Sequence, residues 1–216
     1  MSGTNLSDDG AVALRSGIYG TLAAALSRPK QDPNGVYDAL LEAQAALPST
    51  KAQLENTRTS ERPALAELAK EYLRLFVGPG HVPCSPYEAV HRNDRPDFER
   101  GLVMGPSTAD VRRAYLAAGL DLSKNYTDLP DHIAAEMEFM QFLCVQETRF
   151  RQRGNEEEAA KMKTMQREFY EKHIAPWVSE FADCILHSTT SPFYKVTAGV
   201  LKDFAKREAE YLSEAA

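Results

Sequence analysis

Long apolar runs are missing from this sequence of 216 residues, and none approaches the 18 residues that a membrane-spanning helix needs. The first ten residues, MSGTNLSDDG, lack the basic start and apolar stretch of a secretory signal. Positive charge is also scarce, with 25 Lys and Arg against 31 Asp and Glu and a formal net charge of −6. General nucleic-acid binders usually carry a basic face. These absences predict a cytoplasmic protein that binds no nucleic acid and does not insert stably into a membrane.

Cysteine is rare, and Cys84, Cys144 and Cys184 lie 60 and 40 residues apart. No pair has the two-residue spacing of a zinc or redox motif, and the odd number favours a reducing compartment. The Gly-Pro-Gly run at 78–80 lacks the Lys and Ser/Thr of a phosphate-binding loop. No Cys or Ser is placed with a His as an activated nucleophile would be. We therefore expect no enzyme activity, no cofactor and no metal.

Helical periodicity extends through most of the chain, and no segment alternates apolar and polar residues over more than four positions, as a strand would. The length and composition predict one all-α domain over residues 1–216, a bundle of about eight to ten helices. We expect N-caps at Ser60, Ser107 and Asp128 or a neighbour, with Asn155 starting a further helix, Gly119 ending one and Pro192 opening the last. The predicted helices cover residues 8–27, 33–47, 60–76, 107–118, 130–151, 155–173, 176–187 and 192–211.

A proline-rich segment separates the helices between Val77 and Pro106, with five prolines at positions 79, 83, 86, 96 and 106. Loops of that length are uncommon inside compact domains and are often functional. Only residues 86–91 have a pattern that allows one or two helical turns. We expect this segment to contribute to the function of the protein.

The run Asp-Leu-Pro-Asp-His at 128–132 leads into a helix on which His132 and Glu136 lie one turn apart, on a stripe with Phe139 and Leu143. A carboxylate at that spacing should favour the charged imidazole, beside an almost wholly apolar surface. One interpretation is a polar spot beside a groove that accepts a peptide with basic and apolar side chains. The other is that His132 is a packing residue while the aspartates favour the helix N-terminus. Residue chemistry alone favours the second.

Glu88 and His91 have the Glu-x-x-His spacing of di-iron carboxylate bundles. Such a site needs a second Glu-x-x-His motif and two further glutamates, and the sequence has no second motif. A di-iron site of that kind is thus disfavoured. The spacing still leaves one alternative function, a helical metalloprotein or oxidase that uses Glu88, His91, His132 and Glu136.

Five sequence blocks, in this order, resemble the TorD/DmsD family. They are LRLFVGPG at 73–80, PYEAV at 86–90, MGPST at 104–108, VRRAYLAAGL at 111–120 and LPDHIAAEMEFM at 129–140. Trp177 and the Phe193-Tyr194 pair lie where later helices of the family carry aromatic residues. The resemblance covers roughly residues 65–204.

The resemblance implies an all-helical cytoplasmic chaperone of the redox-enzyme maturation class. Such proteins bind the catalytic subunit of a dimethyl sulfoxide reductase-type molybdoenzyme, often through its twin-arginine signal peptide, before molybdopterin insertion. An oligomeric state of monomer or homodimer stays open. The expected client-binding residues are Phe76, Tyr87, Glu88, Asp131 and His132 from the family blocks, together with Glu136 from the helical stripe.

Three positions depart from the family pattern. Ser85-Pro86 stands where the family often has two prolines, Ala89 where serine is common, and His91 where an aromatic residue is usual. These differences lie in the proline-rich segment, so they bear on the shape of the groove and on which client it accepts.

Overall fold

The computed structural model describes residues 8–47, 62–79, 82–92, 101, 103–123 and 126–214. Within these ranges the chain is all-α, as predicted, and its extended pairing is an isolated bridge between Tyr87 and His132. None of the described helices is both long enough and apolar enough to cross a membrane. The helices are α1 (Asp8–Leu26), α2 (Asn34–Ala46), α4 (Leu65–Tyr72), α5 (Glu88–His91), α6 (Pro106–Ala117), α7 (Ile133–Gln152), α8 (Glu156–Phe169), α9 (Val178–Ser188) and α10 (Pro192–Glu214), with π-helical continuations η2 (Leu73–Val77) and η4 (Tyr170–Ile174).

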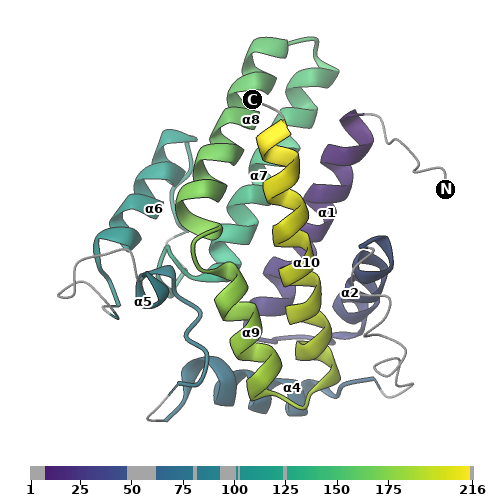
Figure 1. The fold of residues 1–216 in the computed structure, drawn as a ribbon, viewed down its shortest axis with the longest axis vertical. Coiled ribbons are helices and arrows are strands. Elements are labelled where there is room, and N and C mark those ends of the chain that lie inside the picture. The colour runs from purple at the N-terminus through teal and green to yellow at the C-terminus, as the bar shows by residue number, and fades with distance from the viewer. Residues whose placement is uncertain are drawn as a thin grey trace.

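The long helices α1, α7, α8 and α10 run roughly along the long axis of the molecule (Figure 1). α1 packs most extensively against α7, and α7 packs against α8. α4 crosses the lower end of the bundle, while α5 and α6 lie on one side of it (Figure 1). Buried apolar side chains from α1, α2, α4, α6, α7, α9 and α10 form one contacting cluster. Burial of these stripes supplies the main favourable free energy of folding.

Local sequence signals account for several helix ends. Asn155, where a helix was predicted to start, is the N-cap of α8, and its side chain accepts a hydrogen bond from the backbone N–H of Glu158 at 3.2 Å. Gly119 follows α6 with φ +77°, a conformation that glycine adopts without steric cost. α10 begins at Pro192, as predicted. These three signals are local, and each is confirmed.

Two predicted caps are wrong. α6 begins at Pro106, one residue before Ser107, because proline is pre-organised for the first helical position. α7 begins at Ile133, and its cap is His132, whose Nδ1 accepts from the N–H of Ala134 at 3.1 Å. The Asp128 carboxylate accepts from the N–H of its neighbour Leu129 instead. The proposed cap at position 60 lies outside the described residues.

A buried polar network joins the four long helices. Arg15 of α1 donates from Nε to Glu208 of α10 at 2.8 Å and from Nη2 to Gln166 of α8 at 2.7 Å. Gln166 donates in turn to Glu147 of α7 at 2.8 Å, and Tyr19 donates to Glu208 at 2.9 Å. Removing these buried polar groups from water costs free energy, and their hydrogen bonds to one another offset that cost.

Cys84 and Cys184 form a disulfide, with Cα atoms 5.8 Å apart and a sequence separation of 100. It joins the segment before α5 to α9. Cys144 is free and buried. The odd cysteine count favoured reduced thiols, and this pair corrects that interpretation. The packing of α9 against a distant loop brings the two sulfurs together, and no sequence spacing reports such a contact.

Candidate functional site

Two segments far apart in sequence are joined by backbone hydrogen bonds at one side of the bundle. The N–H of Ile133 donates to the carbonyl of Pro86 at 2.8 Å, and the N–H of Glu88 donates to the carbonyl of Asp131 at 3.0 Å. The bridge between Tyr87 and His132 lies between these bonds. The proline-rich segment and the 128–132 run, which the sequence singled out separately, therefore form one structural unit.

Asp131 is fully buried and holds the first turn of α5. Its Oδ2 accepts a hydrogen bond from the backbone N–H of Ala89 at 3.1 Å. Burial raises the pKa of Asp131, and the Ala89 N–H opposes that rise by favouring the carboxylate. In this conformation Asp131 positions α5 from inside the protein.

His132 has 3% of its surface exposed. Its ring packs edge-on against Tyr87, with ring centroids 5.4 Å apart. Because Nδ1 accepts from Ala134, Nε2 carries the proton of the neutral ring, and it lies 3.5 Å from the Tyr72 hydroxyl. Burial lowers the pKa of His132, and Asp128, 4.0 Å away, only partly opposes this. The expected charged imidazole is therefore wrong.

Glu88 is fully buried and lies in an internal ion pair. Its Oε1 accepts from Arg92 Nη1, and its Oε2 lies 2.9 Å from His173 Nδ1. Arg92 also donates to the carbonyl of Lys172 at 2.6 Å. These bonds join α5 to η4, so Glu88 anchors the short helix to the bundle.

Glu136 has no surface exposure, and neither of its carboxyl oxygens has a hydrogen-bond partner among the described residues. Burial raises its pKa well above the ordinary value, and the nearby carboxyls of Glu88 and Asp131 raise it further, against the effect of Arg92. Burial and these two carboxyls favour the uncharged form of Glu136 over the carboxylate. A Glu136 biased toward the uncharged form gives little support to a charged His132, in line with the failed expectation.

Phe76 is part of η2, and its ring packs in a cluster of aromatic side chains. Its ring centroid is 5.1 Å from that of Tyr72, 5.6 Å from Tyr194 and 6.0 Å from Phe181. Tyr72 contacts both Phe76 and His132. Of the six predicted site residues, five gather where α5 meets the start of α7, and Phe76 supports them from behind.

The accessible edge of this region combines Tyr87, a predicted site residue, with Tyr126 and Asp128, which the site prediction did not include. The Asp128 side chain is 38% exposed and accepts from the Tyr87 hydroxyl at 2.7 Å. Tyr126 lies two residues before Asp128 and lines a cavity of about 300 Å³. The other walls of this cavity are mostly apolar and include Leu120, Leu122, Phe139 and Phe142. We call Tyr87, Tyr126 and Asp128 the accessible edge; Asp128 could have been found from its place beside the motif aspartate.

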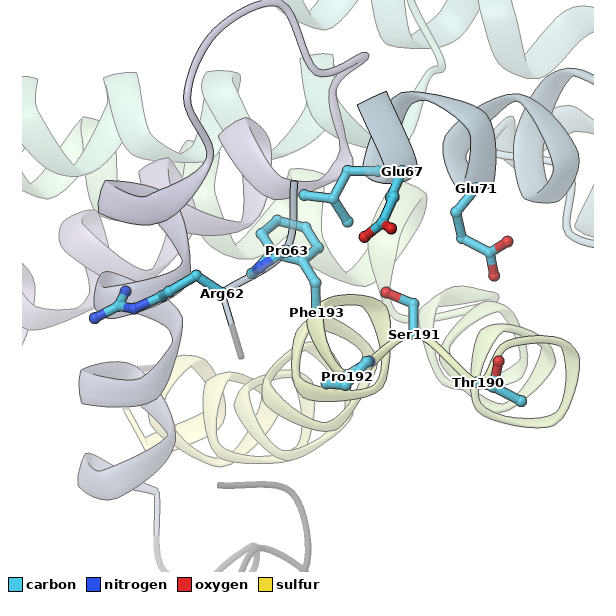
Figure 2. Close-up of a pocket in the computed structure, with 9 residues that line it drawn as sticks. Arg62, Pro63, Glu67, Glu71, Thr190, Ser191, Pro192 and Phe193 are labelled. Atoms are coloured by element: carbon cyan, nitrogen blue, oxygen red, sulfur yellow. The ribbon is translucent and has the colours of Figure 1, made fainter. Parts of the chain in front are cut away.

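A cavity of about 620 Å³, larger than the one that Tyr126 lines, lies elsewhere, between α4 and the start of α10 (Figure 2). Two of its charged side chains already have partners in the protein. Glu71 pairs with Arg74 at 2.7 Å, and Arg62 pairs with Asp38 at 2.5 Å. Size alone therefore does not make this cavity the better candidate.

The residues of the metal hypothesis serve other partners. His91 Nε2 lies 2.7 Å from the carbonyl of Ser85, and its ring stacks on Trp177 with centroids 5.0 Å apart. Within the described ranges, no three His, Cys, Asp or Glu side chains are grouped as metal ligands. The alternative function therefore has no ligand cluster in this part of the chain.

This chain is similar to several known proteins. The family model described as nitrate reductase delta subunit matches residues 34–183. A selenate reductase assembly chaperone from Thauera selenatis is 33% identical over 132 residues, covering 58% of this chain and 64% of that protein. A chlorate reductase assembly chaperone from Ideonella dechloratans is 31% identical over 143 residues, covering 64% and 69%. The chaperone TorD of Shewanella pealeana is 24% identical over 163 residues, covering 74% and 66%.

These matches span about two thirds of the length of each relative. A solved structure described as a redox enzyme maturation protein from Archaeoglobus fulgidus is 22% identical. It covers 92% of this chain and 93% of its own, with a TM-score of 0.48. The family model covers well over half of this chain. The chain therefore belongs to the nitrate reductase delta subunit family of TorD-like proteins, as the five sequence blocks predicted.

Proposed function

We propose that this protein is a system-specific chaperone acting in the cytoplasm, without enzyme activity, on the catalytic subunit of a dimethyl sulfoxide reductase-type molybdoenzyme. It keeps that subunit competent for molybdopterin insertion before assembly or export. Family membership and the relatives named as reductase assembly chaperones support this proposal. We propose further that the chain acts as one TorD-like domain over residues 1–216.

The proposed mechanism is thermodynamic. A chaperone that binds the cofactor-free client more tightly than the finished one shifts the population toward the assembly-competent state. A difference of about tenfold in affinity corresponds to about 1.4 kcal/mol of bias. Binding of the twin-arginine signal peptide would supply part of that difference, because the peptide is exposed before export.

The observation that carries the proposed binding site is the exposed carboxylate of Asp128, two residues after Tyr126, which lines a mostly apolar cavity. A twin-arginine leader combines a basic head with an apolar stretch. Asp128 and the Tyr87 hydroxyl offer acceptors for the head, and the cavity beyond Tyr126 offers apolar walls for the stretch. Electrostatic attraction at a partly exposed carboxylate also raises the association rate.

The buried predicted residues act in this proposal by positioning. Asp131 and Glu88 hold α5 and therefore Tyr87, and His132 packs against the Tyr87 ring. Glu136 and Phe76 fill the space behind them. A client that contacts these five buried side chains directly would first have to open the unit.

Capture of the client tests the function. A tagged form isolated from the source organism grown anaerobically should carry a molybdoenzyme catalytic subunit that keeps its leader, identified by mass spectrometry. A preparation free of such a subunit, made while that enzyme is being synthesised, would contradict the proposal.

The binding site is tested with a synthetic peptide of the recovered leader. Asp128→Asn should raise the Kd by about tenfold and weaken its salt dependence. Glu157→Gln on the exposed start of α8 removes the same charge away from the edge and is the matched control. Equal affinities for the two variants would remove Asp128 from the site.

A further inference from the structure

The disulfide between Cys84 and Cys184 has one protected and one accessible side. Cys84, which follows Pro83 in the chain, is fully buried. Cys184 on α9 is only partly buried. A thiolate can therefore reach the Cys184 sulfur more readily than the Cys84 sulfur. Thiol–disulfide exchange depends on such access and on which sulfur is attacked.

Polar groups stand beside both sulfurs. The Ser188 Oγ lies 3.5 Å from Cys84 Sγ and 3.9 Å from Cys184 Sγ. The carbonyl oxygen of Pro83 lies 3.1 Å from Cys184 Sγ. When the disulfide opens, the Ser188 hydroxyl can donate to a Cys84 thiolate and the Pro83 carbonyl can accept from a Cys184 thiol. The surroundings therefore suit the reduced pair as well as the oxidised one.

The bond also restrains the segment that carries the accessible edge. Cys84 lies three residues before Tyr87, and the disulfide fixes it to α9. The other ties of this segment are the buried Glu88–His173 pair and hydrogen bonds such as Cys84 N–H to Leu75 O at 3.1 Å and Ile133 N–H to Pro86 O at 2.8 Å. Opening a cross-link over 100 residues removes a restraint that no one of these bonds replaces.

We propose that Cys84 and Cys184 form a reversible thiol–disulfide site, whose reactants are dithiol reductants and small-molecule disulfides exchanging at Cys184, and whose state sets how firmly residues 82–92 are held. The exchange reaction is independent of the proposed chaperone function. Its effect on client binding rests on that function.

Both reduction and oxidation of this disulfide proceed through a mixed disulfide at Cys184. In reduction, one thiolate of a dithiol attacks Cys184 Sγ, the Cys84–Cys184 bond breaks, and Cys84 leaves as a thiolate that takes up a proton. The second thiol of the reductant then loses its proton and attacks the reductant sulfur that is bonded to Cys184. This closes the reductant's own disulfide and releases the Cys184 thiolate, which is then protonated. In oxidation by glutathione disulfide, the Cys184 thiolate forms a mixed disulfide and releases one glutathione thiolate. Cys84 then attacks Cys184, closes the bond and releases the second.

Redox titration tests the exchange. The folded full-length protein is equilibrated in glutathione buffers of varied ratio, quenched with acid, unfolded and alkylated, and its peptides are measured by mass spectrometry. Cys84 and Cys184 should change together from protected to alkylated as the buffer becomes reducing, and should return when it is made oxidising. Cys144 should be alkylated in every sample, which makes it the internal control. Loss of the pair's protection without recovery, or no protection at any ratio, would overturn the proposal.

Hydrogen exchange tests the consequence without a client. Protection of the Glu88 and Ile133 amides should fall at least about tenfold on reduction, since local opening governs their exchange. A Cys84→Ser/Cys184→Ser double variant should match the reduced protein, and Cys144→Ser should match the oxidised one. Equal protection in both redox states would overturn the effect on residues 82–92. If protection changes but leader affinity does not, the proposed binding site fails while the redox site stands.

Ser188→Ala separates an exchange site from a passive cross-link. Loss of the hydroxyl should slow reduction by dithiothreitol about tenfold, because a hydrogen bond to a charged group contributes about 1.5 kcal/mol or more. Thr164→Ala, another helical hydroxyl that bonds to its own helix, is the control and should leave the rate unchanged. An unchanged rate in Ser188→Ala would exclude Ser188 as a positioning residue for the exchange.

Discussion

The carboxylate of Asp131 accepts a hydrogen bond from the backbone N–H of Ala89 at 3.1 Å, across 42 residues of sequence. A motif aspartate that the family resemblance implied as a client contact therefore serves as the internal support of α5. Its neighbour His132 supports the same unit through the Tyr87 ring. The unit places Tyr87 and Asp128 at the surface, where a client can reach them.

Replacement of Asp131 should destabilise the fold. Asp131→Ala leaves the Ala89 N–H buried without its acceptor, so the free energy of unfolding should fall by about 1–3 kcal/mol. The Tm should fall by roughly 2–4 °C per kcal/mol for a chain of this size. Thermal unfolding followed by circular dichroism measures the change. Asp121→Ala, an exposed acid 3.5 Å from Arg112, is the control and should change stability by less than about 0.5 kcal/mol.

Glu136→Gln should stabilise the protein at neutral pH. Because the pKa of Glu136 is raised in the folded state, the folded protein holds this proton more tightly than the unfolded chain. The contribution of Glu136 to the free energy of unfolding is greatest below its unfolded-state pKa, near pH 4.5. It decreases as the pH rises toward the folded-state pKa. The glutamine variant lacks that loss, so it should be more stable by about 1–3 kcal/mol at pH 8 and nearly equal at pH 4. Urea unfolding from pH 4 to 8 measures the difference, and a gap independent of pH would contradict the assignment.

His132 should make the fold sensitive to acid in the opposite direction. Its pKa is lowered in the folded state, so its contribution is complete above the unfolded pKa of 6.5 and is lost as pH falls through the folded value. His132→Asn keeps a side-chain acceptor for the Ala134 N–H and removes the titration. The variant should therefore lose less stability than the parent between pH 6.5 and pH 5. Parallel denaturation curves for both proteins over this range would show that His132 is not the titrating group.

The Arg15–Glu208 pair should contribute strongly to stability. Glu208→Ala leaves a buried guanidinium without its main partner and should cost about 3–5 kcal/mol. Lys202→Ala breaks the exposed pair with Asp183 and should cost less than about 1 kcal/mol. Guanidinium unfolding of the two variants provides the comparison. Similar losses would mean that the buried network is not the main tie between α1 and α10.

Much of the fold could be predicted from local patterns. The end of α6 at Gly119, the cap at Asn155 and the start of α10 at Pro192 each depend on a residue and its immediate neighbours. The short helix α5 falls within the only part of the proline-rich segment whose pattern allowed a turn. Ser107 failed as a cap because Pro106, one residue earlier, is the better first residue.

Sequence reasoning grouped most of the candidate residues that lie together in the structure, but it did not give their contacts. The sequence brought Tyr87, Glu88, Asp131, His132 and Glu136 into one hypothesis, and the structure places them together. It did not show that the carboxyls of Glu88 and Asp131 are turned inward, or that Asp128 is the exposed one. Solvent exposure depends on what the rest of the chain places over a side chain, and that information is absent from residue spacing.

The sequence by itself determined the all-α class, the positions of most helices and the family, because helical periodicity, turn residues and motif blocks are properties of neighbouring residues. Only the tertiary structure decided that the charged forms of His132 and Glu136 are disfavoured, since burial lowers the pKa of His132 and raises the pKa of Glu136. It also decided the pairing of Cys84 with Cys184. Both outcomes depend on atoms brought close from distant parts of the chain, where the local dielectric and the neighbouring groups are set by packing.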